Sequence, residues 1–446
     1  MHSITDVVKQ FKQNWTDELS PTAIAQACRD AGMNWNNSAL NPIVAIQIFF
    51  LQILHGNTAI EHLKHLTGKA FAASAYCQAR MRVSLQALHF LLERSVAQMQ
   101  QDTFDTARWL GHRVFHLDGS SFSMPDTPEL RDYFGQPGGQ KPGCGFPVAH
   151  WLVMLHAGTG MITKMLAAPL RRHDMSGAVE LHPELRADDV LVADRGFCSY
   201  AHLALLLQRG VQGVLRIHQR TNVDFTPGRP CAHPALGKSD RKKGMPRSRW
   251  IKQLGRWDQV VEWFKPTSKP DWMSAEQYAA LPTSLMLREL RYTIREKGFR
   301  PKEITLVATL LDVERYTLDD LADLFFQRWE IETNFGHLKT TMKMDVLKCK
   351  TVDGVLRELQ VFALIYNMVR QVILSAASRQ RVDVRRISFI DALRWLQAAS
   401  PGDPLIPLVV NPHRRYRLEP RVRKRRPKQY PLMTKPRQQW KKELEG

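Results

Sequence analysis

Between residues 111 and 218 the hydrophobic pattern switches between strand-like and helix-like segments, in an order that few folds accommodate. The run HRVFHLDGSSFSM predicts a strand, and the apolar runs of VAHWLVMLHAGTGMITKMLAAPL, separated by AGTG, predict a hairpin. A helix (DMSGAVELHPEL), a strand (VLVA), a second helix (SYAHLALLLQRG) and a last strand (VQGVLRI) follow. This order predicts an α/β sheet whose first three strands are antiparallel.

A chain of 446 residues exceeds one ordinary core, so further domains should flank this sheet. Helix–turn–helix spacing near 43–66 indicates DNA binding, although packing of three helices without a ligand explains it at least as well. The strand-like runs LMLRELRYTI and EITLVATLLD come later. The predicted division is a helical DNA-binding domain (1–105), the first part of the α/β core (106–218), a largely β insertion (219–314), a helix that completes the core (315–350), a helical C-terminal region (351–412) and a basic arm (413–446).

The net charge of +20 favours a polyanionic partner, and nucleic acid is the commonest one in a cell. A role in solubility or at the ribosome is the alternative. Half of this charge lies in the basic arm, where 13 Lys and Arg stand against three Glu. Because Pro is frequent there, the arm is predicted to be extended and to bind DNA. Its densest cluster is Arg423, Lys424, Arg425 and Arg426.

Several features indicate a cytoplasmic protein without a membrane segment. The longest apolar run, residues 43–54, has 12 residues with two Gln, which is too short to span a bilayer. Met1 is followed by polar residues rather than by a signal peptide. The six Cys residues are scattered without CxxC pairs, which fits a reducing compartment.

Three carboxylates from distant segments are the candidate catalytic groups. Asp118 and Asp194 each end a predicted strand close to a glycine, in LDGS and ADRGF, and Glu332 lies on a predicted helix. Either Asp alone is more often a turn former than a ligand. Together the three acids make an oxygen-rich site suited to Mg²⁺, or to Mn²⁺ in its place. Two such ions about 3.5–4 Å apart would activate a water or a 3′-hydroxyl and stabilise the leaving oxygen.

The helix predicted over about 317–344 carries an unusual stripe. At about 100° per residue, Phe325, Arg328, Glu332 and Lys339 fall within an arc of roughly 60°. A solvated face with an i,i+4 pair is the plain interpretation. If Glu332 faces metal ions, Arg328 and Lys339 would instead hold DNA phosphates. Trp329, within the same segment, would either stack on a base or pack the helix onto the sheet.

These residues resemble the insertion-sequence transposases that carry a DDE triad and a Tyr-Arg-Glu-Lys signature, often called insertion-sequence family four. The signature spacing is kept at Phe325, Arg328, Glu332 and Lys339, and HLDGSSF and VADRGF match the segments of the two Asp residues. The resemblance implies an RNase H-like core with a mixed five-stranded sheet and a β insertion before the Glu. It also implies two Mg²⁺ ions, cutting and joining of DNA at terminal inverted repeats, and a homodimer in a synaptic complex.

One position departs from the signature, because Phe325 stands where the family has Tyr. If the missing hydroxyl binds a phosphate, one hydrogen bond of roughly 0.5–1.5 kcal/mol is absent or supplied by a neighbouring group. Two other functions therefore stay open. One is a metal-dependent DNA nuclease with the same core and no strand transfer. The other is a decayed transposase that only binds DNA, against which the intact acidic triad argues.

Overall fold

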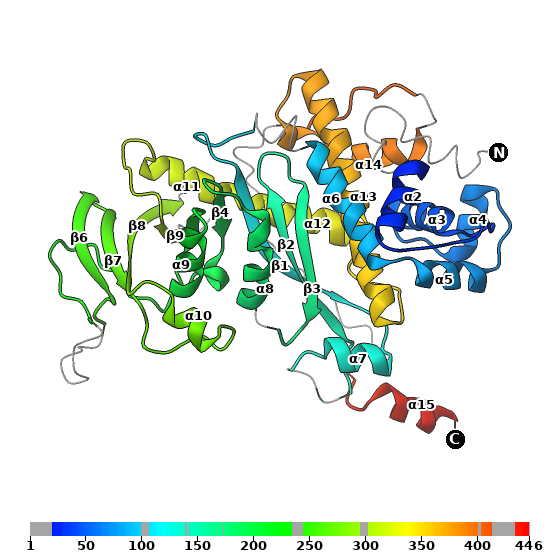
Figure 1. Cartoon of the computed structure of the whole chain (residues 1–446), viewed down its shortest axis with the longest axis horizontal. Coiled ribbons are helices and arrows are strands. Elements are labelled where there is room, and N and C mark those ends of the chain that lie inside the picture. Colours follow the sequence, from blue (N-terminus) through cyan, green and yellow to red (C-terminus); the bar gives the residue numbers. More distant parts are fainter. Residues whose placement is uncertain are drawn as a thin grey trace.

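The computed structural model describes residues 20–99, 107–138, 141, 143–172, 174–233, 244–294, 302–399, 403–412 and 433–445. One long sheet occupies the left and centre of the molecule, and a group of helices lies on the right (Figure 1). The strand order across the sheet is β3-β2-β1-β4-β5-β9-β8-β7-β6. The molecule is therefore a mixed α/β protein, as predicted.

The first three strands are antiparallel, as predicted. β1 pairs antiparallel with β2, which pairs antiparallel with β3, while β1, β4 and β5 run parallel to one another. The hairpin, the short strand VLVA and the two helices between the parallel strands lie where the sequence predicts them. The strands are β1 (Val114–Ser123), β2 (Val148–His156), β3 (Ile162–Pro169), β4 (Val190–Ala193) and β5 (Gln212–Arg216).

The insertion does not form a separate sheet. β9 pairs antiparallel with β5, and β8, β7 and β6 follow, so that the five strands predicted for the core belong to a nine-stranded sheet. β8 and β9 match the two predicted runs, whereas β6 and β7 were not predicted. The elements of this region are β6 (Ser248–Gly255), β7 (Asp258–Phe264), α10 (Ala275–Ala279), β8 (Ser284–Ile294) and β9 (Lys302–Ala308).

The helices on the right share one apolar core with β1–β3. The side chains of Ser20 and Asn41 cap the helices that begin with Pro21 and Pro42. α13 has the length and apolar composition of a membrane-spanning helix, but 83% of its most apolar window is buried by other elements. These helices are α2 (Pro21–Asp30), α3 (Pro42–Leu54), α4 (Ile60–Thr67), α5 (Ala73–Arg82), α6 (Leu85–Met99), α13 (Val352–Gln380) and α14 (Phe389–Ala398).

The two faces of the central strands are covered by different helices. α8 (Asp174–Leu181) and α9 (Tyr200–Gln208) pack on one face through Leu181, Leu203 and their neighbours. α11 (Leu318–Gln327) packs on the other face through Leu321, Leu324 and Phe325. The short elements are α7 (Pro128–Phe134) and the single turns η3 (His182–Glu184), η4 (Arg195–Phe197) and η7 (Val384–Arg386).

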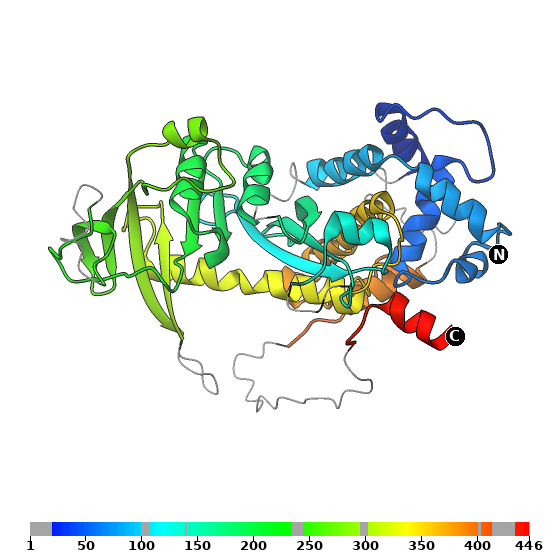
Figure 2. The same cartoon turned by 90° about the horizontal axis from the view of Figure 1, so that it is seen from below.

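The helix predicted over 317–344 is divided into three pieces. Thr317 forms a capping box at the start of α11, Arg328 joins α11 to α12 (Trp329–Gly336), and a π-helical turn, η6 (His337–Thr341), ends the run. Figure 2 shows the run as one nearly straight rod beneath the sheet. Because of the π turn, Lys339 leaves the position that an ideal α-helix would give it.

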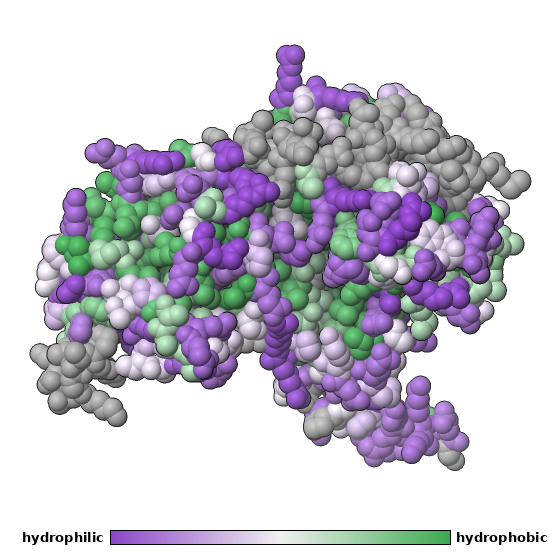
Figure 3. Space-filling view, viewed as in Figure 1, coloured by the Kyte–Doolittle hydropathy of each residue, from purple (hydrophilic) through white to green (hydrophobic). Residues whose placement is uncertain are grey.

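The basic arm is described only at its C-terminal end. α15 (Arg437–Glu445) has no buried residue, and Figure 3 shows it as mostly hydrophilic. Arg437 anchors this end, because its Nη1 lies 2.9 Å from Asp126 Oδ2 and its Cζ lies 3.6 Å from the ring centroid of Phe146. The cluster Arg423, Lys424, Arg425 and Arg426 lies outside the described residues.

Candidate active site

The sheet register brings the two Asp residues side by side. Leu117 of β1 pairs with Ala193 of β4, which pairs with Leu215 of β5. The next residues along, Asp118, Asp194 and Arg216, therefore form a row across three adjacent parallel strands. Asp118 lies within β1 rather than at its end, because β1 continues along β2 to Ser123 after β4 has ended.

This row faces the helix that carries the third acid. Val114, Val190 and Val214 pack against α11. Side chains alternate along a strand, so residues an even number of positions apart point to the same face. Asp118 comes four residues after Val114, Asp194 comes four after Val190, and Arg216 comes two after Val214. Asp118, Asp194 and Arg216 therefore lie on the side covered by α11 and α12.

Arg328 connects two of the acids. Its Nη1 lies 3.2 Å from Asp118 Oδ2, and its Nη2 lies 3.6 Å from Glu332 Oε1. Arg216 holds the remaining acid, with its Nη1 3.5 Å from Asp194 Oδ1. The side chain of Arg328 is 5% exposed whereas that of Glu332 is 51% exposed. Glu332 thus reaches Asp118 through a buried guanidinium and not directly.

Asp118 and Asp194 also line an open cavity of about 300 Å³, which we call the acid cavity. Gly119, Arg195, His150 and His218 line it too. A Cβ on Gly119 would lie 2.7 Å from His150 Nε2, so only glycine lets this imidazole approach the strand. On its other side His150 Nδ1 lies 2.9 Å from Asp174 Oδ1.

The donor set of the acid cavity suits a divalent metal ion in part. Oδ1 of Asp194 is buried and has no hydrogen bond among the described residues, and carboxylate oxygens are the ligands that Mg²⁺ and Mn²⁺ prefer. In the described part of the chain, however, no three His, Cys, Asp or Glu side chains are grouped closely enough to hold a metal. Asp118 and Asp194 therefore share one cavity, whereas Arg328 lies between Asp118 and Glu332.

The acids of the row are partly shielded from solvent, and this burial changes the pKa values of neighbouring groups. Burial raises the pKa of the Asp118 carboxyl, and the charges of Asp194 and Glu332 add to this, while the Gly119 N–H and Arg328 oppose it. Burial and the nearby Arg328 lower the pKa of His116 to about 3, so that this histidine is neutral. The acids therefore depend on Arg328, Arg216 or a bound cation for compensation of their charge.

The predicted stripe is not a solvated face. Phe325 is 1% exposed, and its ring centroid lies 5.5 Å from Arg328 Cζ, so this ring supports the guanidinium and has no surface left for DNA. Trp329 is 40% exposed. Lys339 Nζ lies 5.1 Å from the ring centroid of Phe122, and burial lowers the pKa of this amine. The i,i+4 contact between Arg328 and Glu332 is present, but its cation is buried.

Several residues of the site were missed in the sequence. Arg216, His150, Asp174 and His218 occur in segments without a local motif, and they meet the acids only through strand register and helix placement. Tyr292 on β8 was missed for the same reason. Its hydroxyl is buried without a hydrogen bond among the described residues. Burial raises the pKa of this hydroxyl, and the nearby charges of Arg216 and Arg328 offset only part of the rise.

The sequence profile of the transposase DDE domain matches residues 109–368, which is more than half of the chain. The chain belongs to the DDE transposase family. It is 26% identical over 385 residues to the transposase InsG for insertion sequence element IS4 of Escherichia coli K12, covering 82% of this chain and 79% of that protein. The putative transposase InsZ of the same organism is 27% identical over 140 residues, covering 31% of this chain and 47% of that one.

The solved structure of a piggyBac transposase synaptic complex with hairpin DNA is also similar, with a TM-score of 0.40 and 11% identity. The match covers 89% of this chain and 80% of that chain. The family membership confirms the resemblance predicted from the sequence, and it makes the chain a DNA transposase of the insertion-sequence type. The matched range, residues 109–368, includes Asp118, Asp194 and Glu332.

Proposed function

We propose that this transposase cuts DNA at the terminal inverted repeats of an insertion sequence and joins the freed 3′-OH ends to target DNA. Cleavage and joining would take place in an RNase H-like core formed by β1–β5. The observation that supports it most is the row of Asp118 and Asp194 on adjacent parallel strands, on the face where Arg328 links Asp118 to Glu332.

Asp118, Asp194 and Glu332 are the proposed ligands of two Mg²⁺ ions, or of Mn²⁺ in their place. Bound divalent ions would activate a water or 3′-OH nucleophile and stabilise the leaving oxygen. Arg328 keeps Asp118 and Glu332 within reach of each other and compensates their charge. Arg328 is also proposed to hold a phosphate of the DNA strand that is cut. Lys339 and Trp329 are proposed to contact the same strand.

We propose that Tyr292 supplies the hydroxyl that Phe325 lacks. We expect Tyr292→Phe to slow single-turnover cleavage by about tenfold, as for the removal of one hydrogen bond to a charged group. The free energy of unfolding should stay the same or rise, because the removed hydroxyl is buried without a hydrogen bond in the free protein among the described residues. Cleavage at the parent rate would remove Tyr292 from the site. A loss of stability equal to the loss of rate would indicate a packing role only.

The basic arm and the helices of residues 1–105 are proposed to bind DNA, with Arg423, Lys424, Arg425 and Arg426 binding phosphates. Deleting residues 413–446 should flatten the dependence of the logarithm of affinity on the logarithm of salt concentration, by roughly 0.9 for each phosphate that the arm no longer neutralises. Titration of duplex DNA at several salt concentrations measures this slope. An unchanged slope would show that the arm points away from DNA.

Strand transfer distinguishes this transposase from the two alternatives, a nuclease without strand transfer and a decayed transposase that only binds DNA. Incubating the protein, Mg²⁺, DNA carrying the element ends and a supercoiled target plasmid should yield joined products. Nicks without joined products would indicate a nuclease, and binding without nicks would indicate a decayed transposase. We further propose that two copies of the chain hold the two ends, which cross-linking of the DNA-bound protein would test.

A further inference from the structure

A second cavity, of about 630 Å³, lies in the insertion between the segment that follows β5 and the end of β7. We call it the insertion cavity. Among the described residues that line it, every charged side chain is a cation, namely Arg220, Arg247 and Lys265. Neutral hydrogen-bonding groups complete its polar lining, and they belong to Thr221, Asn222, Thr267 and Ser268. This lining fits an anion that carries further polar groups.

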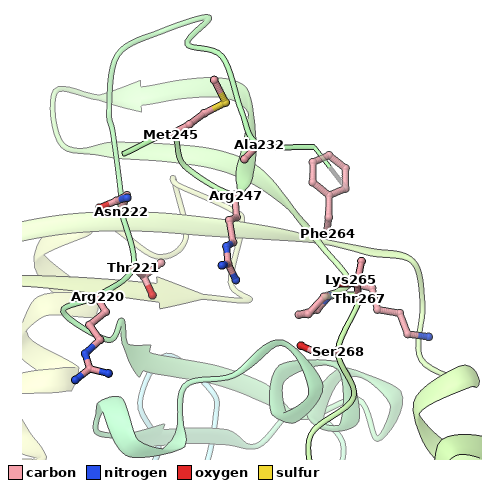
Figure 4. Close-up of a pocket in the computed structure, with 11 residues that line it drawn as sticks. Arg220, Thr221, Asn222, Ala232, Met245, Arg247, Phe264, Lys265, Thr267 and Ser268 are labelled. Atoms are coloured by element: carbon pink, nitrogen blue, oxygen red, sulfur yellow. The ribbon is translucent and has the colours of Figure 1, made fainter. Parts of the chain in front are cut away.

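Two of the three cations are available to such an anion. Lys265 Nζ donates hydrogen bonds to the carbonyl oxygens of Ala279 (3.1 Å) and Leu281 (2.9 Å), and Figure 4 shows its ammonium directed away from the other lining residues. Arg247 projects between the sides of the cavity that carry Thr221 and Ser268 (Figure 4). Within the described chain, neither this guanidinium nor that of Arg220 has an ion-pair or hydrogen-bond partner.

The cavity also offers an apolar surface. Phe264 at the end of β7 is half-buried and lines it, together with Met245 and Ala232. The Phe264 ring has two neighbours: His233, in a T-shaped contact with the ring centroids 4.4 Å apart, and Arg249, whose Cζ lies 5.8 Å from the Phe264 centroid. Because the Arg249 side chain is 56% exposed, a stacked base would have to displace only this guanidinium. An aromatic ring beside cations suits a ligand that combines a phosphate with a flat base, because stacking accepts any base.

One short segment connects this cavity to the acid cavity. Arg216 pairs with Asp194, and His218 lines the acid cavity. Gln219 Oε1 accepts a hydrogen bond of 2.8 Å from Nη1 of Arg195, another lining residue of the acid cavity. Arg220, only two residues beyond His218, already lines the insertion cavity. A nucleic-acid strand that leaves the acids along this segment would therefore reach the second cavity within a few nucleotides, since four residues span at most ~14 Å.

We infer that the insertion cavity binds an unpaired nucleotide of the DNA strand that passes through the acid cavity. Arg220 and Arg247 hold its phosphate, and Phe264 carries its base. This inference rests on the proposed function, because it takes its DNA strand from the reaction at the acids. The site reads no sequence, since stacking and phosphate contacts are shared by all nucleotides.

The test compares binding of two DNA probes in EDTA, a blunt duplex and the same duplex with a six-thymidine single-stranded extension, by fluorescence anisotropy. The full-length parent should bind the extended probe at least about tenfold more tightly than the blunt one, as expected for stacking and charged hydrogen bonds. We call the ratio of the two affinities the margin. The double variant Arg220→Gln/Arg247→Gln should lose this margin and keep its affinity for the blunt duplex. Its salt slope on the extended probe should fall by about 0.7, the value for the one phosphate of a single strand that is no longer neutralised.

Lys252→Gln/Arg256→Gln is the matched control, because it removes the same charge from exposed positions of the insertion that do not line the cavity. It should keep the margin between the probes. Phe264→Leu should reduce the margin, and replacing the thymidines by abasic nucleotides should then have no further effect on this variant. A margin unchanged in Arg220→Gln/Arg247→Gln, or abolished equally in the control, would overturn the inference.

Cleavage by the parent, measured on the extended probe joined to element-end DNA with Mg²⁺ or Mn²⁺, keeps the two proposals apart. If the parent cuts DNA while the margin does not depend on Arg220 and Arg247, the inference fails and the proposed function stands. If the parent cuts no DNA with either metal ion, the proposed function fails whatever the probes show.

Discussion

Replacing Glu332 with Gln should reduce single-turnover cleavage of an element end at least about a thousandfold, which corresponds to ~4 kcal/mol less transition-state stabilisation. The amide keeps the shape of the side chain and its approach to Arg328, but it removes the anionic oxygen proposed to bind metal. Binding of the same DNA in EDTA should be unchanged or tighter, because one negative charge has gone. Quenched cleavage reactions and anisotropy titrations measure the two quantities.

Glu330→Gln is the control for this change. Glu330 lies on the same helix two residues earlier, and its Oε1 lies 3.5 Å from Nη1 of Arg385, outside the row of acids. This variant should cleave at nearly the parent rate. Cleavage by Glu332→Gln within tenfold of the parent would contradict the assignment of Glu332, and equal loss in both variants would point to helix damage.

Replacing Arg288 with Met should lower the free energy of unfolding by about 3–5 kcal/mol, the usual cost of leaving one partner of a buried ion pair unpaired. Arg288 on β8 is fully buried, and its Nε and Nη2 donate to Asp258 on β7 at 2.8 and 2.5 Å. Its Nη1 donates to the carbonyl oxygen of Tyr316 at 2.6 Å. The same side chain thus ties the insertion strands to a residue two positions before the start of α11.

Urea unfolding of Arg288→Met and of Arg249→Met, a control, would measure this effect. Arg249 is 56% exposed and pairs with Glu262 on the same sheet, so its loss should change stability by ~0–1 kcal/mol. Because α11 leads to Arg328, cleavage by Arg288→Met should also fail at a lower temperature than cleavage by the parent. Equal unfolding free energies of the two variants would show that the buried pair does not hold the insertion in place.

Short-range patterns were the part of the fold that could be predicted. The apolar run Val190–Ala193 and the hairpin around AGTG depend on neighbouring residues, and both were predicted from the sequence. β6 was missed because its burial does not alternate: four of its eight residues are exposed, among them the neighbours Ile251 and Lys252. The pairing of β9 with β5 was missed because it joins segments about 90 residues apart, such as Val214 and Ala308.

The residues of the candidate site likewise fall into those that local sequence predicts and those that only long-range contacts determine. Asp118, Asp194 and Glu332 were found through their glycine neighbours and the spacing of one helix. Their partners were not, because the place of Arg216 depends on the register of β5 against β4. The burial of Phe325 likewise depends on which face of the sheet α11 covers. The sequence predicts that Phe325 contacts DNA, whereas in the structure its ring packs against the guanidinium of Arg328.

Iron-mediated backbone cutting tests the central claim most directly. Fe²⁺ loaded in place of Mg²⁺, with ascorbate and peroxide, generates radicals that cut the chain close to the bound ion. We expect DNA-bound protein to be cut near residues 118, 194 and 332 together, with all three cuts suppressed by excess Mg²⁺ and abolished in Asp194→Asn. Cuts near 118 and 194 without any near 332, or cuts at other segments that survive Asp194→Asn, would contradict a metal site built from these three acids.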